Sequence, residues 1–505
     1  MVIKLEKRKD ITYIIVFLAL ILFVWIGLLL LPQPGVTELS GSGTCDLSSA
    51  GFSDMIYVPN GYWTSYPEKL YAPEDFASDF AGDQPVPASA LDYTKVQYAT
   101  HVMTLKLPAG ETFALYLRTA DYSMRLFVNG KELDCVGMPG DSKDATTPRV
   151  LERVYAFTPE TDTTAIVMQA ANFVHREGAL PPRFAVGNYL TVQSRVTKDL
   201  FMAFLVMGAL LAGSLYHLGI FLLNRSRKLS LVLSICCLLF LFLSNKTVPL
   251  LYPGYNWFAA FRLEYLVHYA AFAGVLFFLD MLYPKLFHKP VTRGYYALAG
   301  IYTLLTIILD TTIFTRLLIG FEIASVLLAC YVLVMLSMNL KEKKIQNLLS
   351  FLGIASVAFL GINDILLRFG VTWIGYVGGQ ASGAPFGMMF LTLCYTLLLS
   401  VENNQRDRMM EAARQDIAEA EGRYNELIIK QDAQAPRVSL SDFKLSKRET
   451  DVALLLLSGK TRIEISGTLG IAMGTVNTHC TRIYQKTGCG DAKDLLRLLT
   501  LPKIS

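Results

Sequence analysis

Basic and polar side chains near the C-terminus have the types needed to bind a nucleic acid. Residues 440–505 contain ten lysines and arginines against six aspartates and glutamates, a net charge of +4. Positive charge of this kind attracts a phosphate backbone, whereas asparagine and threonine pair with base edges. The sequence therefore predicts a nucleic-acid interface in this segment, if its helices place these side chains on one surface.

The helices that would position these side chains can be read from their caps and turns. Ser446 and Glu449 form a capping box, and the helix that they open should end at Gly459. A second helix is expected over 462–469, a turn at Gly470, and a third helix from Met473. Two short helices joined by a tight turn form a helix-turn-helix, whose second helix reads the major groove.

This tail, residues 442–505, resembles the LuxR-type helix-turn-helix domain. The pattern is met by Leu445, Arg448, Glu449, Glu464, Ile465, Thr475, Val476, His479, Lys486 and Gly488. The resemblance implies that Asn477, Thr478 and Thr481 project toward bases. It also implies phosphate contacts from a second group: Arg462, Thr475, Arg482 and Lys486. The alternative is a degenerate helical tail that binds no DNA.

The rest of the chain has the composition of a membrane protein. Hydrophobic residues make up 53% of it and charged residues 17%, against roughly 25% charged in soluble proteins. Residues 11–31 carry no charge and span roughly 31 Å as a helix, which predicts an uncleaved anchor after a cytoplasmic segment 1–10. A cleaved signal peptide is the alternative.

Residues 199–400 are almost continuously apolar and predict a seven-helix transmembrane bundle. The expected helices are 199–223, 229–250, 261–283, 294–310, 314–338, 347–368 and 373–400. Lysine and arginine concentrate in every second loop, which indicates the cytoplasmic side. Both termini are therefore expected inside the cell, and residues 33–197 outside the cytoplasmic membrane.

The exported segment 33–197 reads as β structure. Short runs of strand-forming residues alternate with turns such as Asn129-Gly130, a hairpin signal, and this pattern predicts a β-sandwich. Its charge is acidic, with 12 lysines and arginines against 19 aspartates and glutamates. Cys45 and Cys135 are its only cysteines; they either form a disulfide or stay unpaired.

Residues 50–400 resemble bacterial seven-transmembrane receptors with diverse intracellular signalling modules. The resemblance rests on residues 124–130, 137–140, 171–178 and 186–187 of the ectodomain and 361–366 of the bundle. It implies a jelly-roll ectodomain that senses a small molecule or a carbohydrate-like ligand. The residues that it suggests for ligand binding are Arg125, Asn172, His175 and Arg176.

Several polar side chains fall inside the predicted membrane helices at a similar depth. They are Glu264, His268, Glu322, Asn363 and Asp364. Polar groups are costly in a bilayer, so each suggests a functional role. Two interpretations stay open: a hydrated pocket or polar switch beneath the ectodomain, and solvation at the membrane interface.

Charged, helix-forming residues 401–432 follow the bundle. Met410, Ala413, Ile417, Ala420, Tyr424 and Leu427 recur at alternating spacings of three and four. This seam predicts a short parallel coiled coil, with a single solvated helix as the alternative. Residues 433–441 form a linker. A coiled coil over residues 401–432 would make the protein a homodimer.

The sequence contains no nucleophile elbow, metal-ligand cluster or glycine-rich phosphate loop in its exported domain, so we expect no enzymatic activity and no cofactor or metal. The three predicted parts together indicate a membrane-bound one-component sensor and transcription regulator, with double-stranded DNA and the membrane as partners. The alternative is a transporter or channel whose DNA-binding tail regulates its own operon; paired broken helices at mid-membrane would distinguish it.

Overall fold

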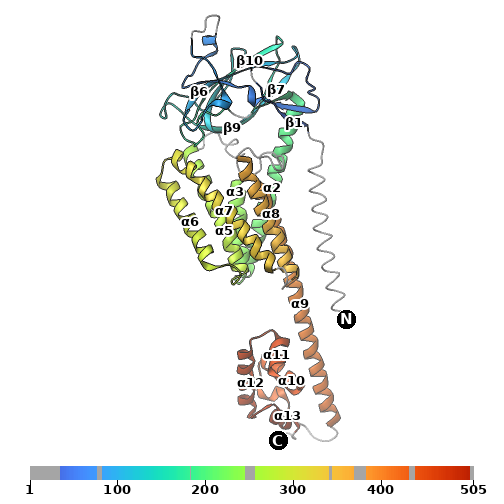
Figure 1. The fold of residues 1–505 in the computed structure, drawn as a ribbon. Helices are drawn as coiled ribbons and strands as arrows, with labels where there is room; N and C mark the ends of the chain where they lie inside the picture. The colour runs from blue at the N-terminus through green and yellow to red at the C-terminus, as the bar shows by residue number, and fades with distance from the viewer. Residues whose placement is uncertain are drawn as a thin grey trace. The chain divides into compact units, whose positions relative to one another are not determined.

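The computed structural model describes residues 34–500 apart from residue 42 and segments 77–81, 182–183, 245–255, 340–343, 369–382 and 432–437. The predicted anchor 11–31 and most of the predicted linker 433–441 lie outside these residues. Strands precede helices along the chain, as Figure 1 shows. The fold class expected from the sequence, a β-sandwich followed by apolar helices and an all-α tail, is confirmed.

The N-terminal domain consists of two sheets that share one long strand, β7 (Phe113–Val128). Its first half pairs with β9 and β11, and its second half pairs with β8 and β10. The first sheet contains β1 (Gly35–Glu38), β3 (Met55–Val58), β11 (Phe184–Asn188), β7 and β9 (Arg149–Phe157). The second contains β8 (Lys131–Val136), β7, β10 (Thr163–Ala171), β6 (Tyr98–Lys106), β4 (Thr64–Pro67) and β5 (Val86–Pro87), with β2 (Thr44–Asp46) on β6.

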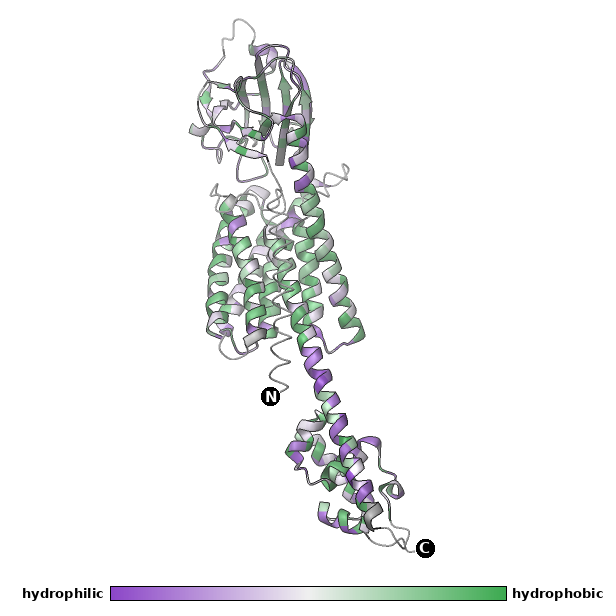
Figure 2. Ribbon diagram, turned by 90° about the vertical axis from the view of Figure 1, so that its right-hand side faces the viewer, coloured by the Kyte–Doolittle hydropathy of each residue, from purple (hydrophilic) through white to green (hydrophobic). Residues whose placement is uncertain are grey.

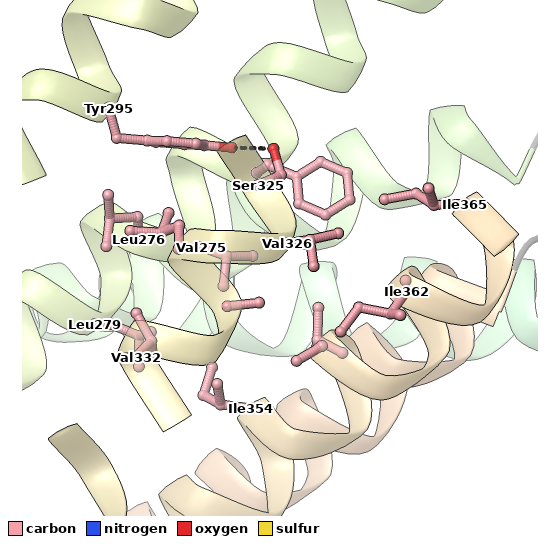
Figure 3. A pocket seen from close by; sticks show the side chains of 16 residues that line it. Val275, Leu276, Leu279, Tyr295, Ser325, Val326, Val332, Ile354, Ile362 and Ile365 are labelled. Atoms are coloured by element: carbon pink, nitrogen blue, oxygen red, sulfur yellow. Dashed lines mark hydrogen bonds between the residues drawn. The ribbon is translucent and has the colours of Figure 1, made fainter. Parts of the chain in front are cut away.

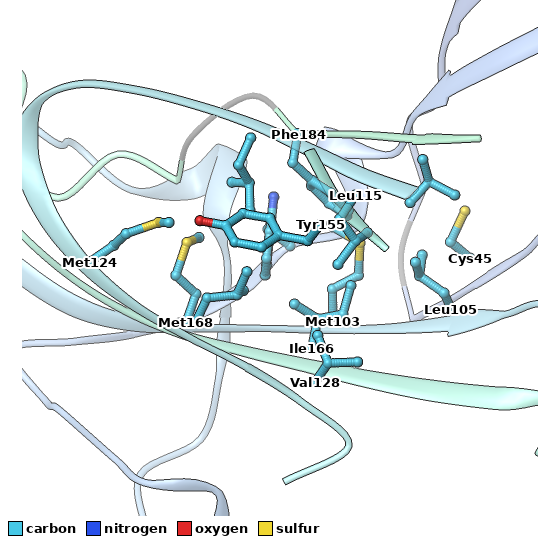
Figure 4. Close-up of a cluster of buried hydrophobic side chains, with 14 of the residues drawn as sticks. Cys45, Met103, Leu105, Leu115, Met124, Val128, Tyr155, Ile166, Met168 and Phe184 are labelled. Atoms are coloured by element: carbon cyan, nitrogen blue, oxygen red, sulfur yellow. The ribbon is translucent and has the colours of Figure 1, made fainter. Parts of the chain in front are cut away.

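A hydrophobic core fills the space between these sheets (Figure 4). Alternate residues of each strand point inward, so Met103 and Leu105 of β6 and Ile166 and Met168 of β10 are all at most 2% exposed. The Asn129-Gly130 turn joins β7 to β8 with positive φ at both residues, as a type I′ hairpin requires. The predicted hairpin is therefore present.

Cys45 and Cys135 do not form the suggested disulfide; both are free thiols. Cys45 lies on β2, which pairs with β6, whereas Cys135 lies on β8, which pairs with β7. The order β2–β6–β10–β7–β8 separates them by four strand spacings, roughly 19 Å, while a disulfide needs Cα atoms within about 7 Å. Burial instead raises the pKa of the Cys45 thiol to about 11.

Seven helices lie between residues 189 and 431 of the described chain, and Figure 2 shows their membrane parts as largely hydrophobic. They are α2 (Tyr189–Leu223), α3 (Lys228–Leu243), α5 (Trp257–Leu282), α6 (Lys289–Ile308), α7 (Thr311–Asn339), α8 (Lys344–Arg368) and α9 (Gly383–Gln431). Five of the helices are long and apolar enough to cross a membrane. Many of their apolar side chains face outward, as lipid-facing residues do; Leu327 is 66% exposed.

Several bundle helices begin earlier than predicted: α5 at Trp257 rather than 261, α6 at Lys289 rather than 294, and α7 at Thr311 rather than 314. The first bundle helix begins at Tyr189 rather than at 199, because Asn188 caps it and Val192 packs against the first sheet. The last membrane helix is described from Gly383, and it runs without interruption through the predicted stalk to Gln431. The start predicted at residue 373 lies outside the described residues.

The C-terminal part folds into four helices: α10 (Lys447–Leu457), α11 (Arg462–Leu469), α12 (Met473–Thr487) and α13 (Ala492–Thr500). Both halves of the Ser446–Glu449 capping box form at the start of α10. Thr461 and Glu464 make a second one at the start of α11. Gly470 adopts the left-handed conformation between α11 and α12, which makes the tight turn of a helix-turn-helix.

Candidate nucleic-acid interface

Helix α12 has one buried and one exposed side. Val476, Cys480 and Ile483 recur at helical spacing and lie in the core of the C-terminal domain. The opposite side carries the side chains predicted to read or grip DNA, all of them exposed: Thr475, Asn477, Thr478, Thr481 and Arg482. The structure therefore places these five predicted residues on one surface.

Two hydroxyls on this surface are oriented by the helix itself. Thr478 Oγ1 donates to the carbonyl of Gly474 at 2.9 Å, and Thr481 Oγ1 donates to that of Asn477 at 3.0 Å. Each hydroxyl proton is thereby used within the helix. The oxygen lone pairs left on the surface suit a donor such as the amino group of adenine or cytosine.

Arg462 reaches this surface from α11. Its Nη1 donates to Asn477 Oδ1 at 3.1 Å, and this bond joins the two helices of the motif. The bond uses the amide oxygen of Asn477 and leaves the amide NH₂ as a donor. Arg462 is thus adjacent to the exposed side of α12, and its hydrogen bond orients the amide of Asn477.

Lys486 is engaged inside the domain. Its Nζ lies 2.7 Å from Glu449 Oε2 and 3.3 Å from the carbonyl of Lys444. The hydrogen bond from Lys486, together with the capping contact to Ser446, lowers the pKa of Glu449 to about 2. The Lys486 ammonium therefore links the end of α12 to the start of α10. The sequence pattern did not indicate this role.

The sequence motif did not indicate one feature of this surface, the uncapped start of α12. Helix α12 starts after Ala472, which offers no side-chain cap, so the first N–H groups of the helix have no side-chain acceptor there. Such groups bind phosphate oxygens in many proteins. Alanine at a helix start is the signal that could have indicated this from sequence.

Three of the four residues suggested for ligand binding, Asn172, His175 and Arg176, lie in the turn that follows β10. Asn172 is 3% exposed; its Oδ1 accepts from the N–H groups of Val174 and His175, and its Nδ2 donates to the carbonyl of Glu177. Asn172 therefore shapes the turn. Arg176 lies beside Glu177 at 3.5 Å, with its side chain 15% exposed.

Arg125 belongs to a different place on the sandwich. It lies on β7, in register with Gln169 of β10, and its Nε is 3.7 Å from Glu132. Gln169 precedes Asn172 by three residues, roughly 10 Å along a strand. The structure thus groups Asn172, His175 and Arg176 and leaves Arg125 on the neighbouring strand.

The turn after β10 contacts the membrane bundle. Val174 is buried in a cluster with Trp257 and Phe261 of α5 and Phe314 of α7. The His175 ring lies 6.4 Å from that of Phe261. A salt bridge between Lys143 and Asp310 and a hydrogen bond from Arg316 to the carbonyl of Thr94 add polar links between the sandwich and the bundle.

The predicted intramembrane polar residues fall into two groups. On α5 and α7, Glu322 is 1% exposed and interacts electrostatically with Tyr269, whose hydroxyl accepts from Thr306. His268 packs its ring against Phe321 of α7, and Glu264 lies one turn earlier, half-buried. Polar groups of three helices thus meet within the bundle.

The second group belongs to α8 and satisfies a helix end. Asp364 accepts hydrogen bonds from the backbone N–H groups of Gly383 at 2.6 Å and Ala384 at 2.8 Å, at the start of α9. A carboxylate at this position stabilises the positive end of the helix dipole. Asn363, next to it, is 3% exposed.

A small cavity lies between α5, α6, α7 and α8 (Figure 3). Its volume is about 70 Å³ and its lining is almost entirely aliphatic, including Val326, Ile354 and Ile362. The hydroxyls of Tyr295 and Ser325 lie on its wall, 2.8 Å apart and bonded to each other. The cavity is apolar and separate from the Asp364 cap.

These features define a multi-pass membrane protein with an N-terminal β-sandwich domain and a C-terminal helix-turn-helix. Residues 199–402 match the family described as 7TM diverse intracellular signalling. Residues 444–499 match the bacterial regulatory proteins of the luxR family. No curated protein matches the chain. The chain therefore joins a membrane signalling unit to a DNA-binding regulatory domain, as both resemblances implied.

Proposed function

We propose that this protein is a one-component receptor that senses a ligand outside the cytoplasmic membrane and regulates transcription by binding DNA directly. The exposed side of α12 is the observation that carries the proposal, because polar and basic side chains of the types that read bases and bind phosphates gather there on a LuxR-type domain. The DNA-binding residues are Asn477, Thr478 and Thr481 for bases, and Arg462, Thr475 and Arg482 for phosphates.

We propose the sandwich as the sensor, with both chain termini in the cytoplasm. The alternating lysine and arginine content of the loops supports this orientation. The contacts of Val174 and His175 with α5 and α7 offer a route by which a change in the sandwich reaches the bundle. The ligand class we favour is a small, polar, carbohydrate-like molecule, which suits the resemblance of the ectodomain.

Transport with self-regulation is the weaker candidate. The cavity between α5 and α8 has an aliphatic lining, which does not favour the passage of a polar substrate. A receptor requires no passage for a substrate, only a movement of the helices relative to each other.

DNA binding by the full-length protein in nanodiscs tests the proposal. Fragments from the chromosomal neighbourhood of its own gene should be shifted, with affinity that falls steeply as salt rises. Arg482→Ala should weaken binding to all sequences and reduce the salt dependence, whereas Arg406→Ala, which removes the same charge from an exposed stalk position, should change neither. Failure to shift any of these fragments, with Arg482→Ala equal to the parent protein, would refute the proposal.

A further inference from the structure

The stalk half of α9 packs against the helix-turn-helix domain of its own chain. Ala420 is 2% exposed and lies in the hydrophobic core formed by α10 to α13, together with residues such as Val452 and Leu455. Ile417 and Tyr424, which flank it at helical spacing, pack on the same core. One face of the stalk is therefore a fifth helical element of the DNA-binding unit.

An ion pair fixes the position of this face. Asp416 Oδ2 lies 2.8 Å from Nζ of Lys460, in the connection between α10 and α11. The Lys460 side chain is 28% exposed and that of Asp416 is 45% exposed, so the pair lies at the edge of the contact. Its charges set the register of the stalk against the domain.

The docked residues are also the centre of the seam predicted for a coiled coil. Ile417, Ala420 and Tyr424 occupy consecutive core positions of that heptad pattern, and the seam residues Met410 and Leu427 remain about half exposed. A side chain buried against its own domain is not available to a second stalk. Docking and pairing of this segment therefore exclude each other.

The sequence of the seam favours docking. Alanine occupies positions 413 and 420, where a parallel dimer gains most from leucine. In a parallel pair Asp416 would also face Glu421 of the other copy, which places like charges together. In the docked form Asp416 meets Lys460 instead.

We propose that residues 413–424 are a docking helix for the chain's own helix-turn-helix domain, and that this contact competes with pairing of two stalks. Release of the helix frees the seam for a second copy of the chain. The consequence for regulation rests on the proposed function, because two half-sites on DNA require two domains held together.

Zero-length carbodiimide cross-linking tests the docking directly. The reagent joins a carboxylate to an amine in contact, so it should link Asp416 to Lys460 in full-length protein reconstituted in nanodiscs. With ¹⁵N-labelled and unlabelled chains mixed before reconstitution, the linked peptides should carry one isotope throughout. Mixed-isotope pairs as frequent as uniform ones would show that the contact joins two chains, and would overturn the proposal.

Charge reversal tests the competition. In a Met410→Cys, Cys489→Ser background, disulfide formation at residue 410 reports stalk pairing. Lys460→Asp should raise the pairing equilibrium about fivefold, because it replaces an attractive contact with Asp416 by a repulsive one and leaves the stalk sequence unchanged.

Lys493→Asp is the matched control, since it makes the same change of charge in the same domain at an exposed side chain of α13. Equal effects of Lys460→Asp and Lys493→Asp, or no effect of Lys460→Asp, would overturn the competition. Neither readout involves DNA, so a protein that docks its stalk but binds no DNA would refute the proposed function and leave the docking intact.

Discussion

At the scale of single residues, the Arg462–Asn477 pair links the two helices of the DNA-binding motif at 3.1 Å. An arginine in this position contributes both charge and the orientation of a neighbouring amide. The two contributions can be separated by a double-mutant cycle, because residues that act through one another give non-additive effects.

We predict that Asn477→Ala and Arg462→Ala each weaken specific DNA binding by about 1–3 kcal/mol. The double variant should lose less than the sum, since the orienting bond is already absent in either single variant. Affinities measured at one salt concentration for a site and for an unrelated sequence check this. Strict additivity would contradict the orienting role, and Arg406→Ala, at an exposed stalk position, serves as the charge control.

His101 is a fully buried titratable side chain of the sandwich. It is 0% exposed; Ser65 Oγ lies 2.7 Å from its Nδ1, and its Nε2 lies 2.8 Å from the carbonyl of Ala179. Burial lowers the pKa of His101 to about 4 and outweighs the hydrogen bond to Ala179. The neutral ring is therefore the form that the fold accepts.

We predict that the sandwich loses stability as the pH falls from about 6.5 toward about 4. The unfolded chain binds a proton at His101 in that window and the folded chain does not, so stability is complete above pH 6.5 and declines by about 3 kcal/mol toward pH 4. Protection of the slowest-exchanging amides of β6 should fall about 20-fold between pH 7 and pH 5. In His101→Gln this dependence should be much smaller; an unchanged slope would contradict the assignment.

At the scale of elements, α8 and α9 pack with almost no space between them. A Cβ atom on Gly387 would lie 2.5 Å from Cα of Val357, and one on Gly353 would lie 3.1 Å from Cα of Leu391. Glycine at these two positions allows the helix backbones to approach closely, as small residues do in membrane bundles.

We predict that Gly387→Ala lowers the stability of the bundle by about 1–3 kcal/mol, because the added methyl group separates the two helices. Thermal unfolding of the detergent-solubilised protein measures it. Gly422→Ala, also on α9, is the control: nothing lies within 4 Å of its Cβ, and alanine should favour the helix by about 1 kcal/mol. A bundle unaffected by Gly387→Ala would show that the close packing is not required.

The sequence predicted element types better than their limits and contacts. Capping boxes, glycines and apolar runs are local signals, so the helix-turn-helix, the Asn129-Gly130 hairpin and the apolar helices were predictable. The cap of α9 by Asp364 and the docking of Ala420 join residues that are distant in sequence, which no periodicity encodes. The same holds for Lys486, whose charge suggested phosphate binding and whose ammonium lies on Glu449.

At the scale of the whole molecule, the turn 172–178 contacts α5 and α7 through the buried side chain of Val174. We predict that Phe261→Ala speeds amide exchange in this turn at least about tenfold, because it removes the ring on which Val174 and His175 pack. Exchange in α12 should not change. Hydrogen exchange with mass spectrometry resolves both segments in one experiment.

Phe258→Ala provides the comparison for this prediction, since Phe258 lies on the same helix and is 46% exposed. It should leave the turn as protected as in the parent protein. Equal effects of the two substitutions would indicate a general loosening of α5 rather than loss of a specific contact.

Strand β11 is followed directly by α2, without a connecting residue. The strand ends at Asn188, the helix begins at Tyr189, and Gly187 lies so close to Val192 that a Cβ there would be 2.9 Å from Cγ2 of that valine. A flexible linker would absorb small displacements through its own torsion angles and dissipate them as entropy. Because no linker separates the two elements here, a displacement of the sheet by a fraction of an ångström strains the first turn of the first membrane helix.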